Sequence, residues 1–157
     1  MPGYANIASQ GEADGVEAPD KLAWTVFKQA RTYAMSMKKP DIRVKRAYLP
    51  AEKEDGARIL VDRLWPRGVT KEKLAATWLR DIAPSTELRK WFHGAPGQWE
   101  AFERRYREEL DANPEGLAAL RSHLKGGRVT FVYGARDEEH NHAVVLRDYV
   151  LRNRDEG

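Results

Sequence analysis

The sequence predicts an α/β fold: a small parallel or mixed sheet of about three or four strands flanked by helices on both faces. Two segments with apolar centres, 58–62 and 129–133, are typical of strands that are buried on both faces. A third run, 42–48, alternates apolar and basic residues, which indicates a strand at a charged edge of the sheet. Amphipathic helical patterns lie between and after these runs, and strands separated by helices favour the α/β class.

Five amphipathic segments after the second strand predict helices. Thr70 and Ser85 are the expected caps of the first two, since a hydroxyl can accept a hydrogen bond from the first turn. Asn113 followed by Pro114 is typical of another helix start. The predicted helices span 70–79, 85–94, 98–112, 114–124 and 143–151.

The ends of the chain differ in composition from its middle. The first residues are small, polar and acidic, and such segments bury too little apolar surface to fold. The predicted segments are a disordered tail at 1–18, an N-terminal amphipathic helix and linker at 19–40, a single α/β domain at 41–153 and a second tail at 154–157.

The N-terminal helix is predicted because apolar residues recur at helical spacing over 20–34. It has three interpretations: a clasp on the domain's own surface, an oligomer contact, or an appendage. Met35 and Met37 are alternative natural starts to Met1.

Length and composition favour a cytoplasmic protein with one domain. A chain of 157 residues can bury a real core but is short for two domains. No apolar stretch approaches the roughly 20 residues of a membrane span, and no secretory signal is apparent. The net charge of +3 is too small to imply nucleic acid unless it is concentrated on one face. The absence of cysteine excludes disulfides, thiolate metal sites and cysteine nucleophiles.

The candidate site lies in two loops, 62–68 and 134–142, that follow the two buried strands. If these strands are parallel, their carboxyl ends lie side by side, where open α/β sheets bind ligands. The candidate ligand-binding residues are Asp62, Arg63, Trp65, Arg67, Tyr133 and Arg136, and the candidate catalytic residues are Asp137, His140 and His142.

These residue types favour a pocket for a phosphate-bearing or other anionic small molecule. The planar guanidinium group suits phosphate and carboxylate, and the start of the last helix adds free N–H groups. His142 or His140 is the acid–base candidate if the protein is an enzyme, a question that stays open. Structural alternatives are that Asp62 pairs with Arg63 and that Asp137 caps the last helix. Trp65 could offer a flat wall to a ring.

Other functions remain as alternatives. A basic strip of Arg43, Lys45, Arg46, Arg63 and Arg67 would suit a nucleic-acid-binding module. The histidines could also serve a purely structural or interaction protein. We predict no metal; a bound metal would use His140, His142 and Asp137. The sequence specifies no cofactor, and the missing glycine-rich, nucleophile-elbow and zincin motifs disfavour those enzyme classes.

Three stretches resemble one known family: Val-Asp-Arg-Leu-Trp-Pro-Arg-Gly at 61–68, the segment 78–92, and Asp-Glu-Glu-His-Asn-His-Ala at 137–143. Together they resemble the DUF488 family, in its YeaO-like branch, over residues 41–153. The resemblance implies a compact cytoplasmic α/β domain of unknown function. Wider members of the group carry a Cys-His pair where Asn141 and His142 stand here, so the resemblance argues against thiol chemistry in this chain.

Overall fold

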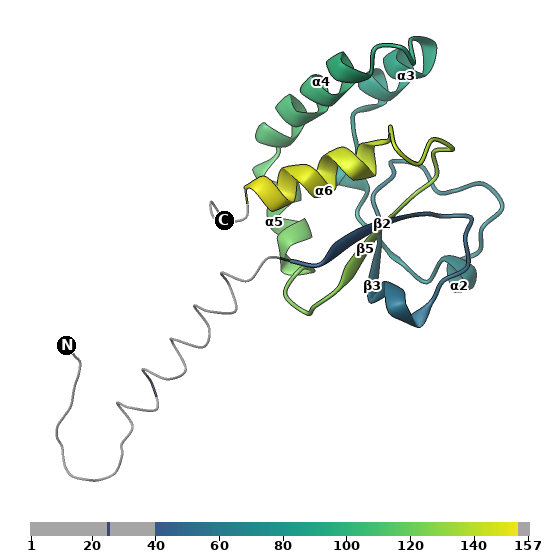
Figure 1. The fold of residues 1–157 in the computed structure, drawn as a ribbon, viewed down its shortest axis with the longest axis vertical. Helices are drawn as coiled ribbons and strands as arrows, with labels where there is room; N and C mark the ends of the chain where they lie inside the picture. Colours follow the sequence, from purple (N-terminus) through teal and green to yellow (C-terminus); the bar gives the residue numbers. More distant parts are fainter. Residues whose placement is uncertain (1–24, 26–39, 154–157) are drawn as a thin grey trace, which may run out of the picture. The chain divides into compact units, whose positions relative to one another are not determined.

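A computed structural model describes Thr25 and residues 40–153, and the latter contain a parallel four-stranded sheet (Figure 1). Its strand order is β2-β5-β3-β4, and every neighbouring pair is parallel. The strands are β2 (Ile42–Arg46), β3 (Ala57–Leu60), β4 (Thr77–Trp78) and β5 (Val129–Tyr133). The predicted α/β class is therefore confirmed, with a parallel sheet.

The three predicted strands occupy the places that their sequence patterns indicate. All five residues of β5 are buried, since this strand lies between β2 and β3. The basic strand β2 stands at one end of the strand order, as the alternation of apolar and basic residues predicted.

Helices α3 to α6 follow the predicted segments closely, whereas α2 does not. The helices are α2 (Lys71–Leu74), α3 (Thr86–Gly94), α4 (Trp99–Asp111), α5 (Pro114–Ser122) and α6 (His142–Arg152). Short 3-10 turns, η1 (Lys53–Asp55) and η2 (Arg80–Ile82), complete the connections. Ser85 and Asn113 cap α3 and α5 through their side chains, as predicted.

The predicted helix 70–79 is wrong beyond its first turn. Thr70 does cap α2, but Ala75 adopts a left-handed conformation with φ of 49° and ends the helix. Trp78, which falls within that predicted helix, lies in β4 and pairs with Leu60 of β3. A two-residue strand carries no alternating pattern, so its pairing with β3 could not be read from its own sequence.

Side chains that alternate along the strands pack into two cores on opposite faces of the sheet. On one face Ile59, Phe131 and Tyr133 pack in the main core, to which α3, α4, α5 and α6 contribute. On the other face Leu60 and Val132 pack against Leu74 of α2 in a smaller core. Figure 1 shows α6 and α4 on one side of the sheet and α2 on the other. Helices therefore cover both faces, as predicted.

Several predictions fall outside the described residues. These are the tail at 1–18, the helix and linker at 19–40 except for Thr25 and Pro40, and the tail at 154–157. No helix in the described part of the chain is both long enough and apolar enough to cross a membrane.

Candidate functional site

Asp62 and His142 meet where β3 and β5 end. Oδ1 of Asp62 lies 2.8 Å from Nε2 of His142, and both side chains are largely but not fully buried. The backbone N–H of Gly134 donates a hydrogen bond of 2.8 Å to Oδ2 of Asp62. A Cβ on Gly134 would lie 2.9 Å from that oxygen, so the close approach favours glycine there. The parallel sheet thus brings the two candidate loops together at one edge.

The imidazole of His142 is held by two oxygen acceptors. Its Nε2 lies 3.1 Å from the carbonyl oxygen of Val61 as well as 2.8 Å from Asp62. Two acceptors require a proton on this nitrogen, which fixes the ring in one orientation. The hydrogen bond of Nε2 is with the carbonyl of Val61, so the buried Oδ1 of Asp62, although 2.8 Å from Nε2, has no hydrogen-bond partner among the described residues.

Tyr106 supports this site from the main core. Its ring meets that of His142 edge-on, with 6.3 Å between centroids, and its hydroxyl donates to the carbonyl of Ile82 at 2.7 Å. Burial raises the pKa of Tyr106 well above its usual value, with further contributions from the charges of Glu109 and Asp62. The hydroxyl therefore remains a neutral donor.

Asn141, and not Asp137, is the N-cap of α6, which corrects the predicted cap. The side chain of Asn141 is buried: Oδ1 accepts from the N–H of Val144, and Nδ2 donates to the carbonyl of Asp137. Both kinds of residue can cap a helix, and only the observed register of the chain selects Asn141. Both polar atoms of the Asn141 side chain are thus used in hydrogen bonds that hold the start of α6, and an amide is not a nucleophile.

Replacing Asn141 with alanine is expected to lower the free energy of unfolding by about 1–2 kcal/mol, because the cap of α6 and the bond to Asp137 are both lost. Thermal or urea denaturation measures the loss. Asn141→Ser keeps a capping oxygen and serves as the control, with a smaller loss. Equal losses for the two variants would contradict the capping role.

Asp137 and His140 form a separate exposed pair. Oδ1 of Asp137 accepts hydrogen bonds from the backbone N–H groups of His140 and Glu139. These bonds lower the pKa of Asp137, with a smaller contribution from the His140 side chain. Nδ1 of His140 lies 3.3 Å from Oδ2 of Asp137, and its ring packs beside Trp99 at 5.0 Å. The two candidate histidines therefore have different partners.

No group of three His, Asp or Glu side chains within the described residues is placed to hold a metal ion. His142 is paired with Asp62, whereas His140 is paired with Asp137. The structure thus does not bring the three metal candidates of the sequence into one cluster.

The candidate arginines divide into bound and free groups. Arg63 donates to the backbone carbonyls of Pro84 and Ala83, at 3.1 and 3.2 Å, and so fastens its loop to the start of α3. Arg67 and Arg136 are exposed, and no described residue forms an ion pair or hydrogen bond with either side chain. The unpaired guanidinium groups of these two loops, among the described residues, are thus those of Arg67 and Arg136.

The basic strip considered for nucleic acid is largely engaged within the molecule. Arg43 lies 3.6 Å from Asp41, and Lys45 contacts Glu52 at 2.7 Å. Arg46 donates to the carbonyl oxygen of Ala135 at 3.0 Å. These three side chains are therefore already bound to acceptors within the protein, which leaves them less available to a nucleic-acid phosphate.

Two further predicted ligand-binding residues, Trp65 and Tyr133, are engaged within the protein. Trp65 packs against the smaller core, on the face opposite to α6, and its indole N–H donates to the carbonyl of Val69 at 2.6 Å. Tyr133 is buried at the end of β5, directly before Gly134. Burial raises the pKa of its hydroxyl, and a hydrogen bond with the side chain of Asn141 acts in the opposite direction.

Sequence reasoning missed two residues that shape this edge. Trp78 donates its indole N–H to the backbone carbonyl of Asp62 at 2.8 Å, and no local pattern signals that contact. Gly134 directly follows the buried strand 129–133, and a glycine in that position is a usable signal of close approach.

Comparisons with known proteins agree on one family. Residues 41–156 match the family DUF488-N3i, described as "Inactive DUF488-N3 subclade". The "Uncharacterized protein YeaO" of Escherichia coli (strain K12) is 45% identical over 111 residues, which cover 70% of this chain and 96% of that protein. The "Uncharacterized protein Rv3073c" of Mycobacterium tuberculosis is 42% identical over 106 residues, 67% of this chain and 89% of that protein. No solved structure gives a significant match.

Proposed function

Because the chain belongs to the DUF488 family, in a subclade described as inactive, we propose that it is a binding domain without catalytic activity. Its ligand is a phosphate-bearing or other anionic small molecule that binds at the carboxyl ends of β3 and β5. The observation that carries this proposal is the contact between Asp62 and His142 at that edge, beside two loops with free guanidinium groups.

The absence of catalysis is supported by the environment of the histidine. His142 has a fixed orientation and a carboxylate partner, as a general acid or base often does. A covalent mechanism would also need an activated nucleophile beside it. The neighbouring Asn141 is occupied in capping α6. The site therefore retains polar groups suited to binding, without a group suited to attack.

The anionic part of the ligand is expected at Arg67 and Arg136 and not at the centre of the site. Asp62 already accepts the N–H of Gly134, and its negative charge disfavours a second anion beside it. The two exposed arginines have no carboxylate in contact among the described residues. Guanidinium groups bind phosphate through paired hydrogen bonds.

Titration calorimetry with a panel of nucleotides and sugar phosphates tests this function. Arg67→Ala and Arg136→Ala are each expected to weaken the tightest ligand about tenfold, the effect of one lost charge-assisted contact. Arg104→Ala, which removes an exposed arginine from α4, is the matched control and should leave affinity unchanged.

Three results would contradict the proposal. If the Arg67→Ala and Arg136→Ala variants bound the ligand as tightly as the parent chain, neither arginine would contribute to anion binding. Turnover of the bound compound, followed by phosphorus NMR, would contradict the absence of catalysis. Tight binding of nucleic acid that weakens steeply with salt would favour the alternative function instead.

A further inference from the structure

A second candidate site lies away from the Asp62–His142 contact, in an open groove of about 780 Å³ beside β4. Cavities of roughly 300–1,000 Å³ accommodate small molecules. The residues of the groove that bear on its chemistry are Arg58, Trp65, Lys71, Thr77, Trp78 and His123.

Two indoles give the groove an aromatic wall. The rings of Trp65 and Trp78 meet edge-on, with 5.4 Å between centroids. Their N–H groups donate to the carbonyls of Val69 and Asp62, so the rings are fixed and offer apolar surface. Arg80, which lines a neighbouring groove, packs over Trp78 at 4.4 Å. The groove therefore has a rigid surface that suits a flat ring.

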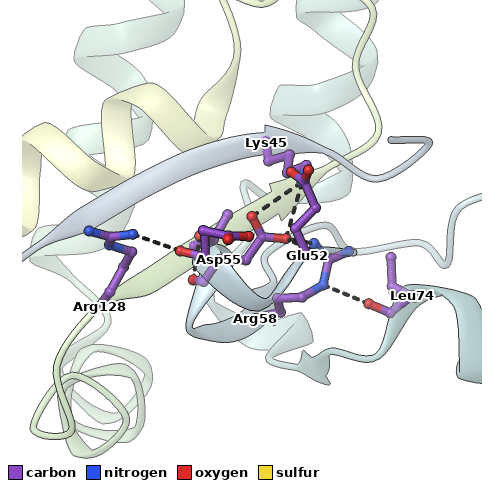
Figure 2. Close-up of polar contacts among 8 residues, drawn as sticks. Lys45, Glu52, Asp55, Arg58, Leu74 and Arg128 are labelled. Atoms are coloured by element: carbon purple, nitrogen blue, oxygen red, sulfur yellow. Dashed lines mark hydrogen bonds and ion pairs between the residues drawn. The ribbon is translucent and has the colours of Figure 1, made fainter. Parts of the chain in front are cut away.

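Arg58 gives the groove a buried cation with one unsatisfied nitrogen. Its side chain is only 4% exposed. Nη1 donates to Asp55 at 2.6 Å and Nε donates to the carbonyl of Leu74 at 2.8 Å, as Figure 2 shows. Nη2 is buried, and none of the described residues offers it an acceptor. A buried donor without an acceptor is costly, and an oxygen bound in the groove would satisfy it once the side chains that cover Nη2 move aside.

The charges around the groove favour an anion with a single charge. The cations Lys45 and Arg58 are balanced by the carboxylates of Glu52 and Asp55. Among the described residues that line the groove, none is acidic, and Lys71 adds one unbalanced positive charge. A carboxylate matches that charge better than a doubly charged phosphate.

We propose that this groove binds a small aromatic carboxylate. The ring lies against Trp65 and Trp78, and the carboxylate faces Lys71 and the unsatisfied nitrogen of Arg58. This site is independent of the proposed function, because it uses other residues and prefers a carboxylate to a phosphate.

Titration of the full chain with indole-3-carboxylate tests the proposal, by calorimetry and by NMR of the tryptophan indole N–H groups. We expect saturable binding that shifts the resonances of Trp65 and Trp78, assigned with single Trp→Phe variants. Lys71→Glu should weaken binding about tenfold, because an attraction becomes a repulsion. Lys73→Glu makes the same charge change on α2 outside the groove and should have an effect of about twofold or less. Both lysines are exposed, so neither change should prevent folding.

Four outcomes would overturn the proposal. The first is no saturable binding, and the second is equal weakening by the two lysine variants. The third is equally tight binding of uncharged indole, which would remove the role of the cations. The fourth is tighter binding of phenyl phosphate, which would show that the carboxylate class is wrong.

Discussion

Replacing Asp55 with alanine is expected to lower the free energy of unfolding by about 3–5 kcal/mol, because it leaves a buried arginine without its carboxylate. Oδ2 of Asp55 accepts hydrogen bonds from Nη1 of Arg58 at 2.6 Å and from the N–H of Glu52 at 2.9 Å. The carboxylate also contacts Nζ of Lys45 at 3.2 Å (Figure 2). Urea denaturation followed by tryptophan fluorescence measures the loss.

Glu52 provides the matched control for Asp55. Its side chain also contacts Lys45 but is 62% exposed, so Glu52→Ala should cost less than about 1 kcal/mol. Combining Asp55→Ala with Arg58→Met removes both buried charges and should recover part of the loss. A loss for Asp55→Ala no larger than that for Glu52→Ala would show that the buried pair does not stabilise the fold.

The same carboxylate has a defined effect on acid stability. Burial alone would raise the pKa of Asp55, but the N–H of Glu52 and the cations Lys45 and Arg58 outweigh it and lower the pKa from its usual 3.8. A lowered pKa means that the stabilisation is present above pH 3.8 and is lost as the pH falls through the folded-state value. The stability of an Asp55→Asn variant should therefore fall less steeply in this acidic range.

The sequence identified those elements whose stability depends on their own residue pattern. Strand β5 is an apolar run because it is buried on both faces, and α4 repeats its apolar residues at helical spacing. The caps at Ser85 and Asn113 were predictable because their side chains act on the next turn of the chain. The β4 strand was not predictable, because its two residues are held by pairing with β3.

The candidate site was predictable in place but not in detail. Two parallel buried strands must end at one edge, so the loops after β3 and β5 had to be neighbours. Whether a loop arginine contacts a ligand or a backbone carbonyl depends on distant segments. The side chain of Arg63 donates hydrogen bonds to the carbonyls of Ala83 and Pro84, and no residue pattern near position 63 predicts these contacts. Trp65 similarly packs against the smaller core, on the face of the sheet opposite to the main core.

Replacing Gly56 with alanine is expected to cost about 3 kcal/mol or more, because both its conformation and its space exclude a side chain. Its φ of 68° is rare for residues with a Cβ, and that atom would lie 2.3 Å from the carbonyl oxygen of Arg128. This oxygen accepts the N–H of Ala57, the hydrogen bond at the start of the pairing between β3 and β5. The added methyl group would therefore displace backbone.

A comparison with Gly68 separates the effect of backbone conformation at Gly56 from the effect of the missing space for a side chain. Gly68 also has a positive φ, of 81°, but a Cβ there would meet nothing within 4 Å. Gly68→Ala should therefore cost only about 1–2 kcal/mol, from backbone conformation alone. Urea denaturation of both variants gives the difference, and equal losses would show that the approach to Arg128 does not matter.

Gly56 also links the strand start to the buried charges. It lies directly after Asp55 and two residues before Arg58, so a shift of its backbone should pull these side chains apart. The losses for Gly56→Ala and Asp55→Ala should then be less than additive in the double variant, since the first change already weakens the pair. Full additivity would mean that the loop accommodates the methyl group without moving the ion pair.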